Sequence, residues 1–242
     1  MFVDCTASEE TGFRYPDLFH SGYQVVACNK IPFSGTYAQY AKLQQEALSA
    51  GISLRYETTV GAALPILATL DRVVCSGDKL ISVQAVLSGT LNYLLDTYDG
   101  KDWDALVEDA REKGYTEPDP SVDLSGKDVL RKVLILSRVA GLPLEESQIS
   151  LEPIPADIAQ RYADAAAKGC KLRYVASVNA EGKAVIGLQE VGPDNPLYSL
   201  SGTNNAILIT TADYPSPMLI QGAGAGTRQT AGGLLNDIML TL

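Results

Sequence analysis

Short apolar runs alternate with longer amphipathic segments over the first quarter of the chain, and this alternation restricts the possible folds more than any other feature. The runs at residues 2–5, 23–28 and 52–57 are typical of strands. Segments 9–21 and 36–50 predict helices, and Gly51 is suited to end the second. Strands that follow one another through helices pair in parallel, so this part predicts a parallel sheet with helices packed on it.

The rest of the chain is first rich in helix and then rich in strand. Helices are predicted at residues 64–74, 102–113 and 123–140, with a strand at 80–87. Later strands are predicted at 172–178, 184–191, 206–211 and 218–221, the first two joined by the turn 179–182, before a final helix from about Thr230. This order predicts an α/β protein in which an α+β domain on a mixed sheet, residues 61–215, interrupts a nucleotide-binding domain built from residues 1–60 and 216–242.

Charge and residue usage narrow the functional classes. The formal net charge of −10 disfavours nucleic acid and anionic membrane surfaces as partners. No apolar run is long enough to span a bilayer, and the N-terminus lacks the basic start of a signal peptide. The four cysteines, Cys5, Cys28, Cys75 and Cys170, fit no zinc motif and are expected to be buried reduced thiols of a cytoplasmic protein. The single histidine, His20, is expected at the surface, which argues against a Ser-His-Asp triad.

Residues 114–132, GYTEPDPSVDLSGKDVLRK, are the strongest candidate for chemistry. Pro118 and Pro120 are expected to hold an acidic loop extended. Asp123 or Ser125 is placed to cap the following helix. The members that carry charge are Glu117, Asp119, Asp123, Asp128, Arg131 and Lys132.

Asp128 and Lys132 are four residues apart and therefore share one face of that helix. A lysine held beside carboxylates could exchange a proton with the hydroxyl or carbonyl of a polar substrate. The same spacing is also common on a solvated helix surface, so spacing alone leaves both interpretations open.

Four further stretches admit a functional and a structural interpretation. The turn GAGAG at 222–226, before the last helix, is suited to close approach of an anionic ligand or simply to tight packing. Carbonyls of 60–64 together with Glu57 could hold a cation or form a buried turn. Ser88 and Thr90 could bind a carboxylate or cap a helix. Lys30 ends a strand, facing either a ligand crevice or solvent.

The runs VDCTAS, VVACNK, YETTVGAALPI, LSGTLNY, GYTEPDPSVDLSGKDVLRK and GAGAGTRQTAGG, in this order, resemble the homoserine dehydrogenase family over nearly the whole chain. The sequence of these segments is most similar to the dehydrogenase part of bifunctional aspartokinase–homoserine dehydrogenases. The resemblance implies NAD- or NADP-dependent interconversion of L-homoserine and L-aspartate 4-semialdehyde, in threonine and methionine biosynthesis. It also implies a remnant of a Rossmann-type domain, and a homodimer or higher homo-oligomer.

The resemblance further implies site residues, position by position. The catalytic acid/base would be Lys132, with Lys30 as a second lysine at the reacting centre. Substrate contacts would come from Gly89, Thr90, Tyr115, Glu117, Asp123 and Asp128. Thr6, Ala7, Asn29, Lys30, Gly224 and Thr230 would lie along the cofactor. Glu57 and the carbonyls of Val60, Ala62 and Leu64 would hold sodium or a similar monovalent cation.

The glycine-rich GxGxxG unit of the family is absent from these residues. We therefore expect an N-terminally truncated chain that binds the cofactor poorly by itself. Two alternatives remain: another amino-acid dehydrogenase or semialdehyde-processing enzyme, and an amino-acid-binding or dimerisation module without catalysis of its own.

Overall fold

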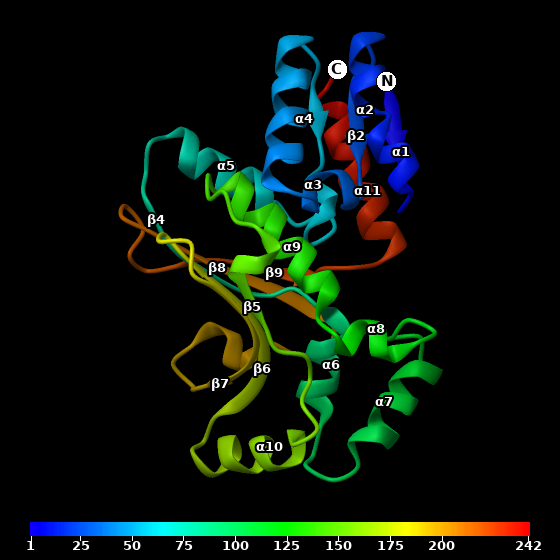
Figure 1. Cartoon of the computed structure of the whole chain (residues 1–242). Coiled ribbons are helices and arrows are strands. Elements are labelled where there is room, and N and C mark those ends of the chain that lie inside the picture. Colours follow the sequence, from blue (N-terminus) through cyan, green and yellow to red (C-terminus); the bar gives the residue numbers. More distant parts are fainter.

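The computed structural model describes residues 1–242 and contains two sheets (Figure 1). The smaller sheet is parallel, with the strand order β1-β2-β3. Its strands are β1 (Phe2–Asp4), β2 (Val25–Ala27) and β3 (Leu54–Arg55), shorter than the apolar runs predicted for them. Helices α1 (Glu9–Phe13), α2 (Tyr15–His20), α3 (Ile31–Ser34) and α4 (Tyr37–Ser49) connect these strands, and α11 (Thr227–Met239) packs on β2. The predicted parallel sheet is confirmed.

The larger sheet has six strands in the order β5-β7-β6-β4-β8-β9. They are β4 (Leu80–Val86), β5 (Ile149–Leu151), β6 (Lys171–Asn179), β7 (Ala184–Val191), β8 (Asn204–Thr211) and β9 (Met218–Ala223). All pairings are antiparallel except β5 with β7, so the sheet is mixed, as predicted. The chain then leaves β9 and returns to the small sheet through α11.

Helices link and flank the larger sheet, and α9 runs between the two sheets (Figure 1). They are α5 (Ile66–Cys75), α6 (Gly89–Thr97), α7 (Trp103–Glu112), α8 (Pro120–Leu124), α9 (Lys127–Val139) and α10 (Ile158–Ala167). Short 3-10 turns occur at η1 (Glu57–Thr59), η2 (Glu146–Gln148) and η3 (Pro196–Ser199). No helix combines the length and the apolar character needed to cross a membrane.

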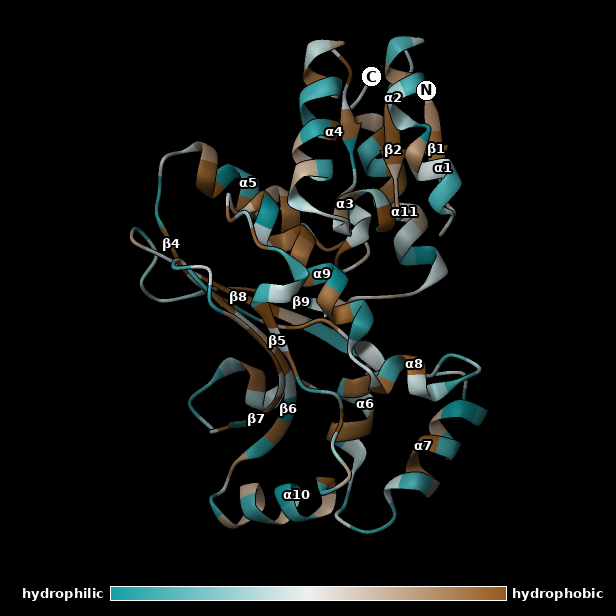
Figure 2. Ribbon diagram, viewed as in Figure 1, coloured by the Kyte–Doolittle hydropathy of each residue, from teal (hydrophilic) through white to brown (hydrophobic).

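One hydrophobic core extends through both parts of the molecule. It includes Tyr15 and Val25 around the small sheet, and Ile135 of α9 and Ile209 of the large sheet. Figure 2 shows the apolar residues concentrated along β1 and β2 and on the inner elements. Because α9 packs against α3, α5 and strand β6, nearly all of its residues from Val129 onward are buried, so its position is fixed by packing.

The single helix predicted at 123–140 is wrong, because the structure divides this segment into α8 and α9. Pro120 begins α8 at a position where its missing N–H costs nothing, and the side chain of Asp119 caps that helix. Gly126, with φ +72°, turns the chain between the two helices. The prediction that Asp123 or Ser125 is the N-cap of α9 is wrong, because Gly126 occupies that position. The hydroxyl of Ser125 nevertheless accepts from the N–H of Lys127, the first residue of α9, over 3.3 Å.

Other expectations also need correction. Cys5 and Cys75 are exposed, while Cys28 and Cys170 are partly buried, so the predicted burial of all four thiols is wrong. All four are free, as expected. The last helix begins at Thr227 rather than at Thr230. Strand β5 and helix α10 were not predicted: β5 has only three residues, and only Ile158 and Ala165 of α10 are buried.

Candidate active site

Lys132 lies within α9 with its ammonium group enclosed by the protein. Its side chain is 10% exposed. The Nζ atom donates a hydrogen bond to the carbonyl oxygen of Leu87 over 2.6 Å and lies 2.9 Å from Oδ2 of Asp128. Asp128 is one helical turn earlier on the same face, as the four-residue spacing predicts. Leu87 directly follows β4 and leads into α6, so this contact joins α9 to the end of a strand of the large sheet.

Lys30 reaches the same carboxylate from the small sheet. It follows β2, and its Nζ lies 3.3 Å from Oδ1 of Asp128. Burial opposes ionisation of Asp128, but the ammonium groups of Lys132 and Lys30 outweigh it and hold the pKa of this carboxyl well below its usual range. Asp128 is therefore an anion that links two lysines from different parts of the fold.

A cavity of about 240 Å³ opens beside these three groups. The predicted site residues in its wall are Lys30, Ala62, Asp128, Lys132, Gly224 and Thr230. Gly224 comes from the β9–α11 connection, Thr230 from the first turn of α11, and Ala62 from the turn after η1. The cavity is therefore formed where the small sheet, α9 and the glycine-rich loop meet, and no single stretch of sequence contains it.

The remaining predicted substrate residues form a neighbouring cluster and do not line this cavity. The hydroxyl of Thr90 donates to the carbonyl of Tyr115 over 2.7 Å, which ties the start of α6 to the acidic loop. Within that loop, the backbone N–H of Glu117 donates to Oδ2 of Asp123 over 2.9 Å. Gly89 packs against the carbonyl of Thr203, leaving no room for a side chain. This cluster adjoins the cavity through Leu87, two residues before Gly89.

Two predicted cofactor residues, Thr6 and Asn29, bond to a buried carboxylate, Asp4, at the end of β1. The Oδ1 atom of Asp4 accepts from the N–H and hydroxyl of Thr6, and its Oδ2 accepts from the hydroxyl of Tyr15 and from Nδ2 of Asn29. Burial raises the pKa of Asp4, but these hydrogen bonds outweigh it and lower the pKa overall. Thr6 and Ala7 are exposed, whereas the amide of Asn29 donates internally to Asp4 and to the carbonyl of Ser8. Asp4 was not predicted as a site residue; its signal was an acid at the end of an apolar strand.

The predicted cation loop offers a mixed set of oxygens. The carbonyls of Val60 and Ala62 accept no hydrogen bond, and Ala62 has φ +53°. The carbonyl of Leu64 accepts from the N–H of Ile66 over 2.8 Å. Both carboxylate oxygens of Glu57 accept N–H groups at the start of α5. Two of the four predicted ligands are thus free, and two are already engaged.

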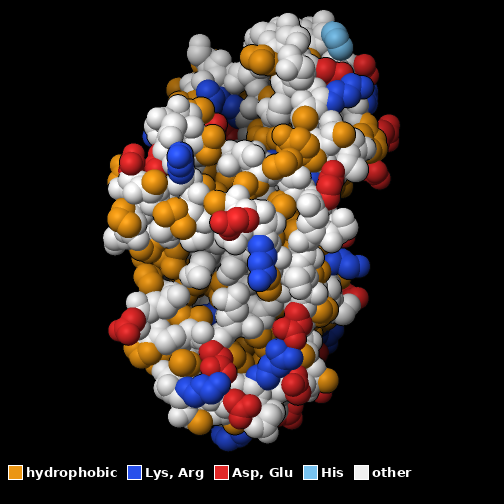
Figure 3. Space-filling model, turned by 60° about the vertical axis from the view of Figure 1, so that its left-hand side comes forward, with side chains coloured by type: hydrophobic (Ala, Val, Ile, Leu, Met, Phe, Trp, Pro, Cys, Tyr) orange, Lys and Arg blue, Asp and Glu red, His pale blue; other side chains and the backbone are white.

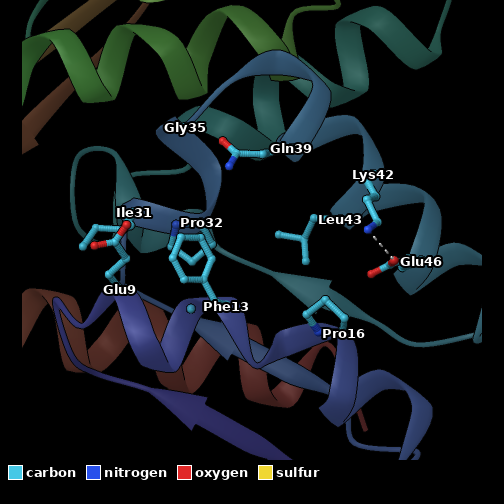
Figure 4. Close-up of a pocket in the computed structure, with 11 residues that line it drawn as sticks. Glu9, Phe13, Pro16, Ile31, Pro32, Gly35, Gln39, Lys42, Leu43 and Glu46 are labelled. Atoms are coloured by element: carbon cyan, nitrogen blue, oxygen red, sulfur yellow. Dashed lines mark ion pairs between the residues drawn. The ribbon is translucent and has the colours of Figure 1, made fainter.

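A second pocket, of about 260 Å³, lies on the small-sheet side among α1, α3 and α4 (Figure 4). Phe13 and Pro32 face it, and an ion pair of Lys42 with Glu46, at 3.7 Å, lies at one end. It holds no counterpart of the lysine–carboxylate group. Figure 3 shows acidic and basic side chains interspersed on one face of the molecule, with His20 at the surface as expected.

Comparison with known proteins decides the family. The family profile described as homoserine dehydrogenase matches residues 65–239. The chain belongs to the homoserine dehydrogenase family. This match includes Asp128, Lys132 and the glycine-rich loop, but begins after Lys30.

Relatives in the homoserine dehydrogenase family match over nearly all of this chain. The maize chloroplastic bifunctional aspartokinase/homoserine dehydrogenase 2 is 39% identical over 99% of the chain, which spans only 29% of that relative's length. The homoserine dehydrogenase of Paracoccidioides brasiliensis is 35% identical, with 100% of this chain and 74% of that protein covered. A hyperthermophilic archaeal homoserine dehydrogenase in complex with NADPH superposes with a TM-score of 0.84 at 29% identity, covering 99% of this chain and 70% of that one. The α/β fold predicted from the sequence is thereby confirmed.

Proposed function

We propose that this chain is the catalytic part of an NAD(P)-dependent oxidoreductase that interconverts L-homoserine and L-aspartate 4-semialdehyde. The observation that carries the proposal is the group Lys132–Asp128–Lys30, which joins both halves of the fold beside one cavity. The family and the NADPH in the archaeal relative support the reaction class. The substrate, the cofactor and the residue roles below are parts of this proposal.

Lys132 is the proton carrier. In the direction that forms homoserine, its ammonium gives a proton to the aldehyde oxygen as that oxygen gains negative charge. In the reverse direction a neutral Lys132 accepts the hydroxyl proton. Asp128 keeps the side chain in place and, with Lys30 as its second partner, is not free to take the proton itself. A bound nicotinamide cofactor supplies the hydride acceptor or donor.

The amino-acid end of the substrate lies toward the α6–α8 cluster. Glu117, Asp123 and Asp128 provide carboxylates for an ammonium group. Gly89, Thr90 and Tyr115 shape the opposite wall, where the hydrogen bond of Thr90 to Tyr115 holds the two segments together. This orientation places the side-chain oxygen of the substrate toward Lys132, because Leu87 connects the cluster to the lysine.

The cofactor runs along the strand ends of the small sheet. Thr6, Ala7, Asn29 and Lys30 lie at the ends of β1 and β2, and the loop that contains Gly224 leads to Thr230 on α11. The N–H groups of this loop are free and fit an oxyanion. Residues 1–242 contain no GxGxxG fingerprint, so by themselves they bind NAD(P) weakly. In this scheme residues 1–60 and the segment after β9 form the nucleotide-binding part, and the intervening residues bind substrate and dimerise.

A monovalent cation such as sodium binds the turn at 60–64. The free carbonyls of Val60 and Ala62 support this site, and Glu57 and Leu64 join it only if they share oxygens that already accept hydrogen bonds. Replacing sodium by choline in the buffer tests the site. Loss of thermal stability specific to choline is expected, and identical melting in both buffers counts against it.

The chain assembles as a homodimer or higher homo-oligomer. β9 forms an edge of the six-stranded sheet and has alternate residues exposed, among them Leu219. A non-catalytic amino-acid-binding or dimerisation module is the second candidate function favoured by this edge. Light scattering tests the assembly.

A cytoplasmic location is retained as part of the proposal, although the maize relative is named chloroplastic, and cell fractionation tests it.

The decisive test is Lys132→Met, with Lys127→Met as its control. Both residues lie on α9, but Lys127 is exposed and at the first turn. Lys132→Met should reduce homoserine oxidation by about a thousandfold, the typical range for a proton-transfer group, at an unchanged circular dichroism spectrum. Lys127→Met should retain turnover. Assays use this chain and a version extended at its N-terminus. Equal rates for both variants, where the parent is active, would refute the role of Lys132.

A further inference from the structure

Asn205 is a buried amide without a partner. It lies in β8 and is 1% exposed, yet neither Oδ1 nor Nδ2 makes a hydrogen bond. An amide removed from water in this way costs free energy on the order of 1–3 kcal/mol unless a partner compensates. Most buried side-chain polar atoms in folded proteins have a partner, so two unpaired atoms on one residue need an explanation.

The surroundings of Asn205 connect it to the candidate active site on both sides. Its strand neighbour Ala206 pairs with Val86, so continuing the register by one residue brings Asn205 opposite Leu87. Leu87 is the residue whose carbonyl accepts the ammonium of Lys132. On the other edge, Asn205 pairs with Gly222, and its side chain lies against Gly224.

Contact with Gly224 is so close that no other residue fits there. A Cβ on Gly224 would overlap the carboxamide of Asn205 and lie 2.6 Å from its Cβ. The glycine is therefore required by the asparagine beneath it. Gly224 itself is buried and lines the cavity of Lys132.

The loop of Gly224, Ala225 and Gly226 is also short of hydrogen bonds. None of its three N–H groups donates a hydrogen bond, and the carbonyls of Gly224 and Ala225 accept none. Unpaired donors and acceptors of the loop thus lie next to an unpaired donor and acceptor of Asn205. A small movement of the loop, which carries no large side chain, would let the two sets pair.

We propose that Asn205 is a positioning residue whose carboxamide pairs with the backbone of loop 224–226 when the loop closes on a bound oxyanion. The oxyanion is a phosphate of the cofactor, and the free N–H groups of the loop bind it. The inference rests on the proposed function for the identity of this ligand. Asn205 does not touch the reacting atoms. It sets the distance between the loop and the Leu87 carbonyl that anchors Lys132.

Asn205→Leu tests the proposal because leucine has a similar volume and no polar atoms. The free protein should melt at the same or a slightly higher temperature, since two unpaired buried groups are gone. The apparent Kd for the ligand and the KM should rise about tenfold, while kcat changes less than threefold. Asn204→Leu is the matched control: it is the adjacent strand residue, and its amide bonds only to the Ser201 carbonyl. This control should bind like the parent.

Hydrogen exchange over residues 222–230 is measured with NADP⁺ alone and with L-homoserine alone. NADP⁺ should protect this segment in the parent, and Asn205→Leu should lose that protection. Protection by L-homoserine but not by NADP⁺ would overturn the assignment of the phosphate. The pair Gly224→Ala and Gly224→Ala/Asn205→Gly distinguishes pairing from packing. The double variant removes the Cβ of residue 205 as well as its carboxamide, so it should regain part of the stability that the single variant loses, without regaining ligand protection.

Equal ligand affinity and equal protection in the parent and Asn205→Leu would overturn the positioning role while leaving the proposed function intact. A parent protein that shows neither turnover nor protection with either ligand, also with the N-terminal extension, would refute the proposed function and the ligand-driven closure together.

Discussion

Replacing Gly126 by alanine should loosen the joint that orients the lysine–carboxylate group. Gly126 has φ +72°, where an alanine costs about 1–2 kcal/mol. Its new Cβ would overlap the hydroxyl of Tyr174 and lie 2.9 Å from Cδ1 of Leu151. Displacing that hydroxyl breaks its 2.7 Å hydrogen bond to the carbonyl of Glu152, worth about 1 kcal/mol. The free energy of unfolding should therefore fall by about 2–3 kcal/mol in all.

Gly114→Ala provides a matched control for this experiment. Gly114 has the same φ of +72°, but a Cβ there would meet nothing within 4 Å. Its replacement should cost only the backbone term, about 1–2 kcal/mol. Equilibrium unfolding in urea measures both variants against the parent. If the two variants lose equal stability, the packing of α8–α9 against β5 and β6 contributes nothing, and the reasoning from Gly126 is refuted.

Three further predictions concern titration and reactivity. The pKa of Asp128 is lower in the folded protein than its unfolded-state value of about 4, so this carboxylate stabilises the fold at higher pH. That stabilisation is lost as the pH falls below the unfolded-state pKa. Asp128→Asn should therefore lose less stability than the parent between about pH 5 and pH 2, as measured by unfolding in urea. Burial, and to a lesser degree the charge of Glu152, raises the pKa of Tyr174 to about 12. The stabilisation by the neutral phenol is therefore full below about pH 10 and is lost as the pH rises toward 12. Ultraviolet titration should show a tyrosine that ionises late and is missing in Tyr174→Phe, and an unchanged curve would contradict this. A thiol reagent should modify Cys5 and Cys75 faster than Cys28 and Cys170 in the native protein, as followed by mass spectrometry, and uniform rates would oppose this order.

Elements with a strong local signal were predicted well from the sequence. Helix 36–50 was found because an amphipathic segment is followed by Gly51, and the structure adds a capping box of Thr36 with Gln39 at its start. The hairpin of β6 and β7 was found because its turn residues stand between two apolar runs. The break at Gly126 was missed because the apolar spacing of 123–140 continues through it, and only the fold shows that Tyr174 occupies the space beside that glycine.

The candidate site divides in the same way. The four-residue spacing of Asp128 and Lys132 was readable locally, and the structure has this ion pair at 2.9 Å. The contact of Lys132 with Leu87 joins residues 45 positions apart, and Lys30 lies still further away in the sequence. The spacing of apolar residues along the sequence cannot predict such contacts, because they depend on how the elements around α9 pack together in the fold. Asn205 was missed for the same reason: within NNAILITT it resembles the ordinary start of a strand.

The position of Asp128 explains why the site needs both sheets. One oxygen faces a lysine of its own helix, and the other faces Lys30 at the end of β2. Without Lys30, the carboxylate would serve only as a local helix pair, worth a few tenths of a kcal/mol. With Lys30, the same carboxylate also binds a residue at the end of β2, so it connects the small sheet to α9. A ligand bound at the end of β2 that shifts Lys30 therefore also shifts the carboxylate of Asp128, which holds Lys132. Ligand binding at the strand ends is in this way coupled to the orientation of the Lys132 ammonium group.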